Sequence, residues 1–213
     1  MLPLLDSAEV RVLGALIEKE ATTPEYYPLS LNALVNACNQ KSNREPVVDY
    51  DDETVLAAIE GLREKRLAFI VTGSGRVTKY SQRLSETLNL GRRELAVVCT
   101  LLLRGQQTLG EIKDRSERMF AFGDSAEAER LLQKLEELPE GPLVKRLSRQ
   151  PGQKEARYAH LFSGEPAPQL SSEKPASMET PTRVSMLEQE LQALRGDFEE
   201  LKRRFNDLEA QLR

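Results

Sequence analysis

The sequence is poor in the residues that most often carry metal binding and acid–base chemistry. Its 213 residues contain no tryptophan, one histidine and two cysteines, and aromatic side chains make up 5% of the chain. A single histidine leaves few metal ligands and few general bases. Cys38 and Cys99 lie in apolar periodic segments, where we expect reduced, buried thiols and no disulfide framework. We therefore expect a protein that is not an enzyme and has no cofactor or metal.

Long apolar segments are absent as well. No hydrophobic run approaches the roughly 18 residues that span a bilayer, and the N-terminus lacks the basic and apolar regions of a secretory signal. These absences predict a cytoplasmic protein with no membrane partner.

Charge is abundant but nearly balanced. Lys and Arg number 30 against 34 Asp and Glu, which gives a net charge of −4 at pH 7. This balance argues against a protein that binds nucleic acid over its whole surface. Any polyanionic partner must therefore contact local basic patches.

The first part of the chain has the pattern of three helices and a hairpin. Asp6 and Glu9 have the spacing of a capping box at the start of a helix. The segment 23–28 ends this helix. A second helix is predicted from Leu29–Ser30 and a third from Asp51–Asp52. Two β-prone runs, 67–72 and 76–83, follow around Gly73-Ser74-Gly75, which is a hairpin signal.

The same order recurs in the second part. One helical pattern contains Glu94, a second begins near Thr108, and a third begins at Asp124 or Ser125. Two β-prone runs follow, at 143–147 and 156–161. Three helices and a hairpin form the order of a winged helix-turn-helix. We predict a mainly α, α+β protein with two tandem winged helix-turn-helix domains, at 1–85 and 86–163.

Long stretches within residues 6–160 also resemble a known family. They are Leu-Ile-Glu-Lys-Glu (16–20), Tyr-Tyr-Pro-Leu-Ser-Leu-Asn-Ala-Leu (26–34), Ala-Cys-Asn-Gln-Lys-Ser-Asn-Arg-Glu-Pro (37–46), Arg-Glu-Leu-Ala-Val (93–97) and Arg-Gln-Pro-Gly-Gln-Lys-Glu-Ala-Arg-Tyr-Ala-His (149–160). In these segments the chain is similar to the YceH-like family of uncharacterised bacterial tandem winged-helix proteins. The resemblance implies two winged domains and no established activity.

The predicted hairpins carry most of the candidate contacts to double-stranded DNA. In a helix-turn-helix the start of the third helix enters the major groove, but here those starts carry acidic residues that repel phosphate. Basic hairpins can instead follow a phosphate backbone. The alternative is that exposed hairpins are simply charged. The candidate residues are Arg76, Lys79, Arg83, Lys145, Arg146, Arg149, Lys154 and Arg157.

The polar loop 39–46 is a second candidate. Lys41 and Arg44 are potential anion ligands, and Asn43 belongs to a group of amides of the kind that read base edges. The alternative is that the loop caps the second helix and shapes a turn.

Other polar and aromatic residues point to no reaction. We expect Glu18 and Glu20, on different faces of a helix, to be solvated, and His160 to be hydrogen-bonded or exposed. The simplest interpretation of four aromatic residues is core or interface packing. These residues are Tyr26, Tyr27, Phe120 and Phe122.

The C-terminal segment predicts self-association. Residues 164–181 are rich in proline, serine and glutamate, as in a disordered linker. Residues 182–213 then show apolar spacings of three and four, which predict a coiled-coil helix. The predicted oligomer interface is Val184, Leu187, Leu191, Leu194, Phe198, Leu201, Phe205, Leu208 and Leu212.

Charges beside this interface favour a parallel arrangement. In a parallel pair, Glu190 faces Arg195, Asp197 faces Lys202 and Arg204 faces Glu209, and all three pairs are opposite in sign. We expect a homodimer in preference to a trimer, and the alternative is a helix that folds back on its own winged domains.

Together these patterns predict a non-enzymatic, DNA-associated protein that acts as a homo-oligomer. The competing hypothesis is an adaptor that binds an unidentified protein through its winged domains without contacting DNA.

Overall fold

The computed structural model describes residues 2–71, 77–139, 141–149, 153, 155–166 and 202. Residues Met1–Ala167 form one compact unit and Pro168–Arg213 form a second. The predicted coil lies outside the described residues apart from Lys202, and so does most of the predicted linker.

The first half of this unit contains four helical segments and a small sheet. Asp6 caps the first helix and Glu9 closes the capping box, as its spacing predicted. The sheet is antiparallel with strand order β1-β3-β2, and it pairs Leu29 with Tyr80 and Ala68 with Gln82. The elements are α1 (Ser7–Thr22), η1 (Pro24–Tyr26), β1 (Leu29–Ser30), α2 (Leu31–Cys38), α3 (Asp52–Glu64), β2 (Ala68–Val71) and β3 (Lys79–Gln82).

The second half repeats this connectivity after a short linking helix. Its sheet is again antiparallel, with the equivalent strand order β4-β6-β5. The predicted α+β class is therefore confirmed. The elements are α4 (Leu84–Thr87), α5 (Arg92–Arg104), β4 (Gln107–Thr108), α6 (Leu109–Ser116), α7 (Ser125–Glu136), β5 (Val144–Arg146) and β6 (Arg157–His160).

The shortest elements differ from the prediction. Leu29 and Ser30 do not open a helix, because they pair with β3 while the Ser30 hydroxyl caps α2. Thr108 caps α6 in the same way after the two-residue strand β4. A strand of two residues has no alternating pattern of its own, so only its partner strand defines it.

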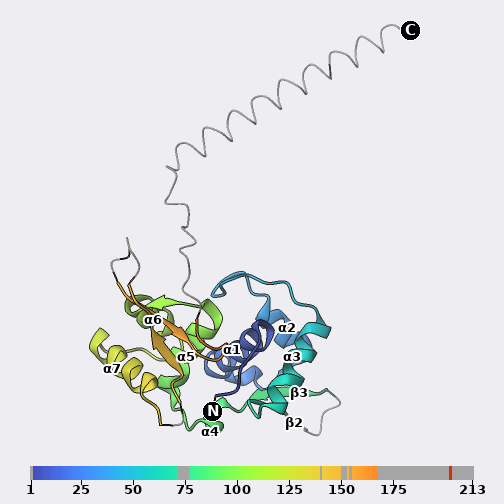
Figure 1. Cartoon of the computed structure of the whole chain (residues 1–213). Coiled ribbons are helices and arrows are strands. Elements are labelled where there is room, and N and C mark those ends of the chain that lie inside the picture. Colours follow the sequence, from blue (N-terminus) through green and yellow to red (C-terminus); the bar gives the residue numbers. More distant parts are fainter. Residues whose placement is uncertain are drawn as a thin grey trace. The chain divides into compact units, whose positions relative to one another are not determined.

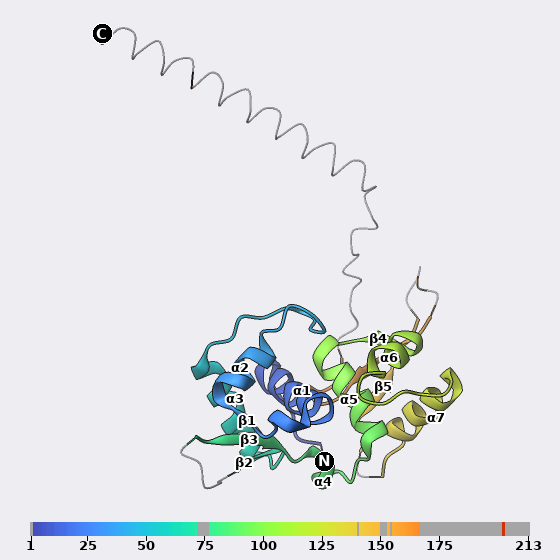
Figure 2. The same cartoon turned by 180° about the vertical axis from the view of Figure 1, so that it is seen from behind.

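Helices α1 and α5 join the two halves and lie side by side in both views (Figures 1 and 2). Helix α1 is buried continuously from Glu9 to Glu18. A Cβ atom at Gly14 would lie 2.8 Å from Leu103 Cδ2, so glycine at this position allows α1 to lie close to α5. The Cys99 thiol donates to the Gly14 carbonyl at 3.3 Å.

The two cysteines are free and buried, as predicted. Burial raises the pKa of Cys38 to about 12 and also raises the pKa of Cys99. Both thiols are therefore uncharged near neutral pH and act as small core side chains.

Candidate nucleic-acid interface

The hairpin of the first half presents one unpaired cation. Lys79 begins β3 and is exposed, and no carboxylate among the described residues pairs with it. Arg83 is also exposed, but its Nε lies 3.2 Å from Glu86 Oε2. Arg76 lies outside the described residues.

Carboxylates neutralise part of the second hairpin. Lys145 Nζ lies 2.7 Å from Glu165 Oε1. Arg157 Nη1 donates to the Gln106 carbonyl at 2.9 Å and lies 3.2 Å from Glu111 Oε2. These two side chains are held against the protein and present less net charge to a phosphate than their sequence suggests.

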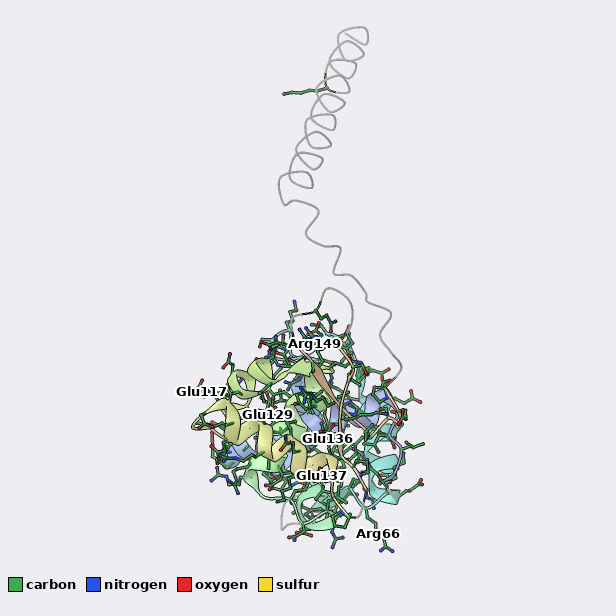
Figure 3. All side chains as sticks on the ribbon, turned by 60° about the vertical axis from the view of Figure 1, so that its left-hand side comes forward. Arg66, Glu117, Glu129, Glu136, Glu137 and Arg149 are labelled. Carbon is green, nitrogen blue, oxygen red and sulfur yellow. The ribbon has the colours of Figure 1, made fainter. Side chains whose placement is uncertain are left out.

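Two arginines of this hairpin remain exposed. The Arg146 guanidinium lies 6.0 Å from the centroid of the Tyr158 ring, at the outer limit of a cation–π contact, and no described carboxylate pairs with it. Arg149 follows β5 and lies at the far end of the hairpin in Figure 3. Lys154 lies outside the described residues.

The third helix of each half begins with carboxylates. Asp51 caps α3 through the Thr54 amide at 2.9 Å, and hydrogen bonds from Thr54 lower the pKa of this exposed carboxyl. Asp124 caps α7 through the Glu127 amide at 2.7 Å. Glu129, Glu136 and Glu137 of the α7 region appear together on one side of the unit in Figure 3. The carboxylates at the start of each third helix offset the positive end of the helix dipole and repel phosphate.

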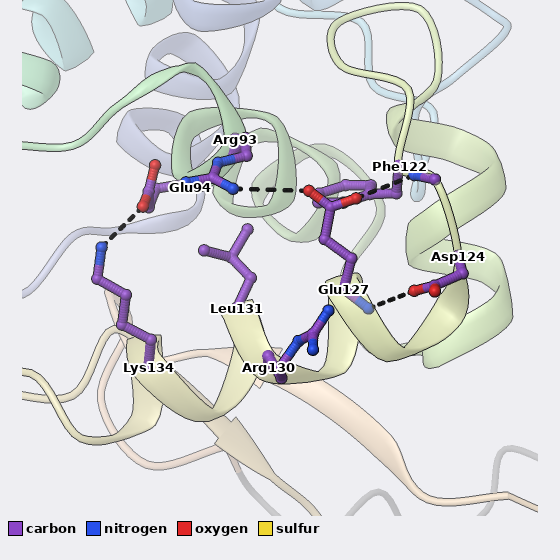
Figure 4. Close-up of a pocket in the computed structure, with 9 residues that line it drawn as sticks. Arg93, Glu94, Phe122, Asp124, Glu127, Arg130, Leu131 and Lys134 are labelled. Carbon is purple, nitrogen blue, oxygen red and sulfur yellow. Dashed lines mark hydrogen bonds and ion pairs between the residues drawn. The ribbon is translucent and has the colours of Figure 1, made fainter.

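A groove of about 480 Å³ lies between α5 and α7 (Figure 4). Its charges pair internally: Arg93 lies 3.6 Å from Glu127, and Lys134 lies 2.9 Å from Glu94. Burial opposes ionisation of Glu94, but the bond from Lys134 prevails and lowers its pKa. Arg130 is exposed on the rim and is unpaired within the described residues. The groove therefore has little net charge with which to select a ligand.

The loop 39–46 holds a buried ion pair. The side chain of Arg44 has no solvent exposure, and its Nη2 lies 2.6 Å from Glu18 Oε2. Its Nε and Nη2 also donate to the Ala37 carbonyl at 3.1 and 2.8 Å. Arg44 is therefore out of reach of a phosphate, contrary to expectation, and the expectation of a solvated Glu18 is wrong. The partners are 26 residues apart, so no local pattern reveals the pair.

The same loop contacts the second half. Asn43 Oδ1 accepts a hydrogen bond from the Arg104 guanidinium, and the Glu45 amide donates to the Leu103 carbonyl at 2.8 Å. Burial, together with the nearby Arg115 and Arg44 cations, lowers the pKa of Arg104. The amide of Asn43 thus binds protein, and Lys41 is the exposed cation that the loop leaves for an external anion.

Comparison with known proteins places the chain in a family. Residues 5–153 match the family model described as "Protein of unknown function, DUF480". The chain belongs to the DUF480 family.

Relatives in this family match nearly end to end. The UPF0502 protein of Solibacter usitatus is 53% identical over 205 residues, which cover 94% of this chain and 98% of the relative. The UPF0502 protein of Pelobacter propionicus is 52% identical over 215 residues, covering 98% of each chain. The UPF0502 protein YceH of Escherichia fergusonii is 44% identical over 213 residues, covering 98% and 97%. The resemblance to the YceH-like family is confirmed.

Family membership assigns no reaction, and the remaining candidates form no catalytic group. His160 ends β6, and its Nδ1 is buried without a hydrogen-bond partner among the described residues, so the expectation of a satisfied or exposed histidine is wrong for this atom. Burial lowers the pKa of His160 to about 4. Within the described residues, no cluster of three His, Cys, Asp or Glu side chains suits a metal ion. None of the described helices has the length and apolar character of a membrane span.

The aromatic candidates divide between surface and core. Tyr26 is 72% exposed, whereas Phe122 is buried and meets the Phe120 ring edge-on at 5.0 Å. The Tyr27 hydroxyl accepts bonds from the Gln82 amide and the Ser81 hydroxyl at 2.7 and 3.0 Å. Burial raises the pKa of Tyr27 to about 12, so this residue is a neutral link between η1 and β3.

Proposed function

We propose that this chain is a non-enzymatic, cytoplasmic, DNA-associated protein in which each half is a winged helix-turn-helix unit. Each half has the order helix, short strand, two helices and hairpin, with the last strand in the centre of its sheet. This connectivity supports the winged-helix assignment.

The observation that carries the DNA-binding proposal is the distribution of charge on the exposed side chains. Lys79 and Arg146 are exposed on the two hairpins and have no carboxylate partner among the described residues. Arg149 is exposed on the same hairpin as Arg146. The starts of α3 and α7 are acidic. We infer that the hairpins contact phosphates and that the third helices do not read bases. Such binding is sequence-independent and strongly dependent on salt.

The C-terminal heptads extend this proposal to a dimer. The repeated apolar positions from Val184 to Leu212 suit a parallel pair of helices. Two copies would carry four hairpins, and simultaneous engagement of weak sites raises the overall affinity.

A protein-binding adaptor is the second candidate, and the α5–α7 groove favours it. The groove combines the apolar Phe122 and Leu131 with internally paired charges and borders the acidic start of α7. Such a surface is better suited to a polypeptide than to a polyanion.

Fluorescence anisotropy of the full-length chain on random duplex DNA tests the DNA proposal. Between about 50 and 200 mM salt we expect a steep loss of affinity, because cations released from the phosphates drive the binding. Absence of binding at the lowest salt would overturn the proposal and direct the search to protein partners.

Light scattering tests the dimer proposal. Wild-type chain is expected to be a dimer at micromolar concentration, and Leu194→Pro is expected to be a monomer because proline breaks the coiled-coil helix. The near-UV circular dichroism of the tyrosines, all of which lie within residues 1–167, should be unchanged. A monomeric wild type would refute the coil.

A further inference from the structure

A second cavity, of about 440 Å³, lies where the two halves meet. Its walls come from the end of α1, the end of β3, the start of α4 and the start of α5. In both views α4 lies at this junction (Figures 1 and 2). The volume is within the range of small-molecule sites, and junctions between structural units are where such sites are often found.

Most of the lining is apolar. Ile17 comes from α1, Leu90 and Leu95 come from the segment that enters and begins α5, and Met119 follows α6. Methionine has a flexible, polarisable side chain that adapts to ligands of different shape. The cavity can therefore hold the apolar part of a ligand.

One carboxylate stands in this apolar wall. Glu20 Oε2 accepts a hydrogen bond from Gln82 Nε2 at 2.6 Å. Gln82 is in turn fixed by Ser85, whose amide donates to Gln82 Oε1 at 3.1 Å. The end of β3 therefore holds the carboxylate in position on the cavity wall.

The charge of Glu20 is uncompensated. It has no ion-pair partner among the described residues, and burial together with the charge of Glu86 raises its pKa. A bound cation would offset both effects, whereas a bound anion would add repulsion. The second half has no carboxylate at the corresponding position, which is Gly105, the residue that follows the end of α5.

We propose that this cavity binds a small organic ammonium ion with an apolar body. The ammonium group donates hydrogen bonds to the Glu20 carboxylate, and the apolar body packs against Ile17, Leu95 and Met119. Charge-assisted bonds of this kind are the strong ones among hydrogen bonds. This inference is independent of the proposed DNA contacts, which involve the hairpins.

Methionine methyl NMR gives a local test on the full chain. The chain has four methionines, at positions 1, 119, 178 and 186, and Met119 is the one that lines the cavity among the described residues. With ¹³C-methyl-methionine, the Met119 signal is assigned by Met119→Leu. The probes are isoamylamine, leucine, isoamyl alcohol and isovalerate, which share the branched apolar body and differ in charge.

We expect millimolar isoamylamine to shift the Met119 signal and to leave the other three unchanged. Isoamyl alcohol should bind at least about tenfold more weakly, because it lacks the charge-assisted bond. Leucine tests whether the ammonium group belongs to a free amino acid or to a simple amine. If leucine binds more tightly than isoamylamine, the ligand is a free amino acid whose carboxylate contacts the exposed Arg92 on the rim. Weaker binding identifies a simple amine.

Two variants test the site itself. Glu20→Gln keeps the shape and removes the charge, and it should weaken isoamylamine about tenfold or more. Ala21→Trp fills the cavity from its rim and should abolish the shift. Their matched controls, Glu64→Gln and Ala57→Trp, lie on exposed positions of α3 and should bind as wild type does.

Either of two results would overturn the proposal. One is the absence of any Met119 shift with isoamylamine or leucine in the wild-type chain. The other is equal binding of isovalerate, isoamyl alcohol and isoamylamine. If Glu20→Gln fails to fold by circular dichroism, Ala21→Trp decides the location of binding.

Discussion

The two halves of the folded unit share one connectivity and one glutamate–lysine pair, but they cap the helix that carries the glutamate differently. Glu9 and Glu94 each occupy the third position of a long helix, and each pairs with a lysine of its own half. Asp6 caps the first of these helices, whereas Gly91 stands at the second cap. A Cβ atom at Gly91 would lie 2.9 Å from Glu94 Oε2, a contact that the flexible end of Glu94 can relieve. The cap of α5 therefore differs from that of α1 in lacking a side-chain acceptor.

The larger difference lies in the connection between the second and third helices. Residues 39–51 form this connection in the first half, and only 117–124 form it in the second. The longer segment carries the buried Arg44–Glu18 pair and contacts the end of α5. A repeated fold therefore explains what the halves share, and the departure from the repeat marks where one half binds the other.

Removing Arg44 should produce the largest loss of stability. Arg44→Met leaves the buried Glu18 with only the longer contact to Lys19 Nζ at 3.9 Å, and we expect a cost of about 3–5 kcal/mol in the free energy of unfolding. The control Arg63→Met breaks the exposed Glu60–Arg63 pair and should cost less than about 1 kcal/mol. Urea denaturation measures both, and equal losses would contradict the distinction between the two pairs.

His160 should make stability depend on pH in a way that the first half does not. Its counterpart in β3 is Gln82, because Tyr158 and Tyr80 hold the same register in the two sheets. The folded pKa of about 4 lies below the usual 6.5, so the unfolded chain takes up the proton first as pH falls. Stability from this residue is present above pH 6.5 and is lost progressively toward pH 4.

The size of this effect is about 3 kcal/mol at most. His160→Gln, which introduces the residue of the first half, should remove this part of the pH dependence. Urea denaturation of wild type and variant at pH 7 and pH 4.5 measures it. Parallel pH profiles for the two proteins would show that His160 titrates normally in the folded chain.

Gly61→Ala should have a smaller effect, of about 1–3 kcal/mol. A Cβ atom there would lie 2.2 Å from Glu9 Oε1, so Glu9 would have to move away from Lys65. The second half places Lys134 at the equivalent position of α7 and has no such restriction. In the control Gly110→Ala, the added Cβ atom would have no other atom within 4 Å. We expect thermal melting of this variant to show no loss of stability. A destabilised control would indicate that glycine is needed for another reason.

The sequence predicts the features that depend on neighbouring residues. The caps at Asp6, Asp51 and Asp124 satisfy amides within three residues, and each lies where the helix was expected to begin. The apolar spacing likewise predicts the helices and hairpin strands of both halves. These signals are local, so one chain segment is enough to reveal them.

The features that the sequence does not reveal join distant segments. Arg44 meets Glu18 across 26 positions, and Gln82 meets Glu20 across 62. A polar residue near an apolar stripe looks solvated in sequence, and only the packing of the other half buries it. The candidate cations at Lys145 and Arg157 were predicted as surface charges, but their acidic partners lie 20 and 46 residues away.

The salt dependence of DNA affinity in hairpin variants tests the central proposal most directly. Each phosphate contact contributes about 0.9 to the slope of log affinity against log salt. We predict that Lys79→Gln and Arg146→Gln each lower this slope by about one contact per chain, that the double variant lowers it by about two per chain, and that Arg130→Gln on α7 leaves it unchanged. Equal slopes for wild type and the double variant would contradict the assignment of DNA binding to the hairpins.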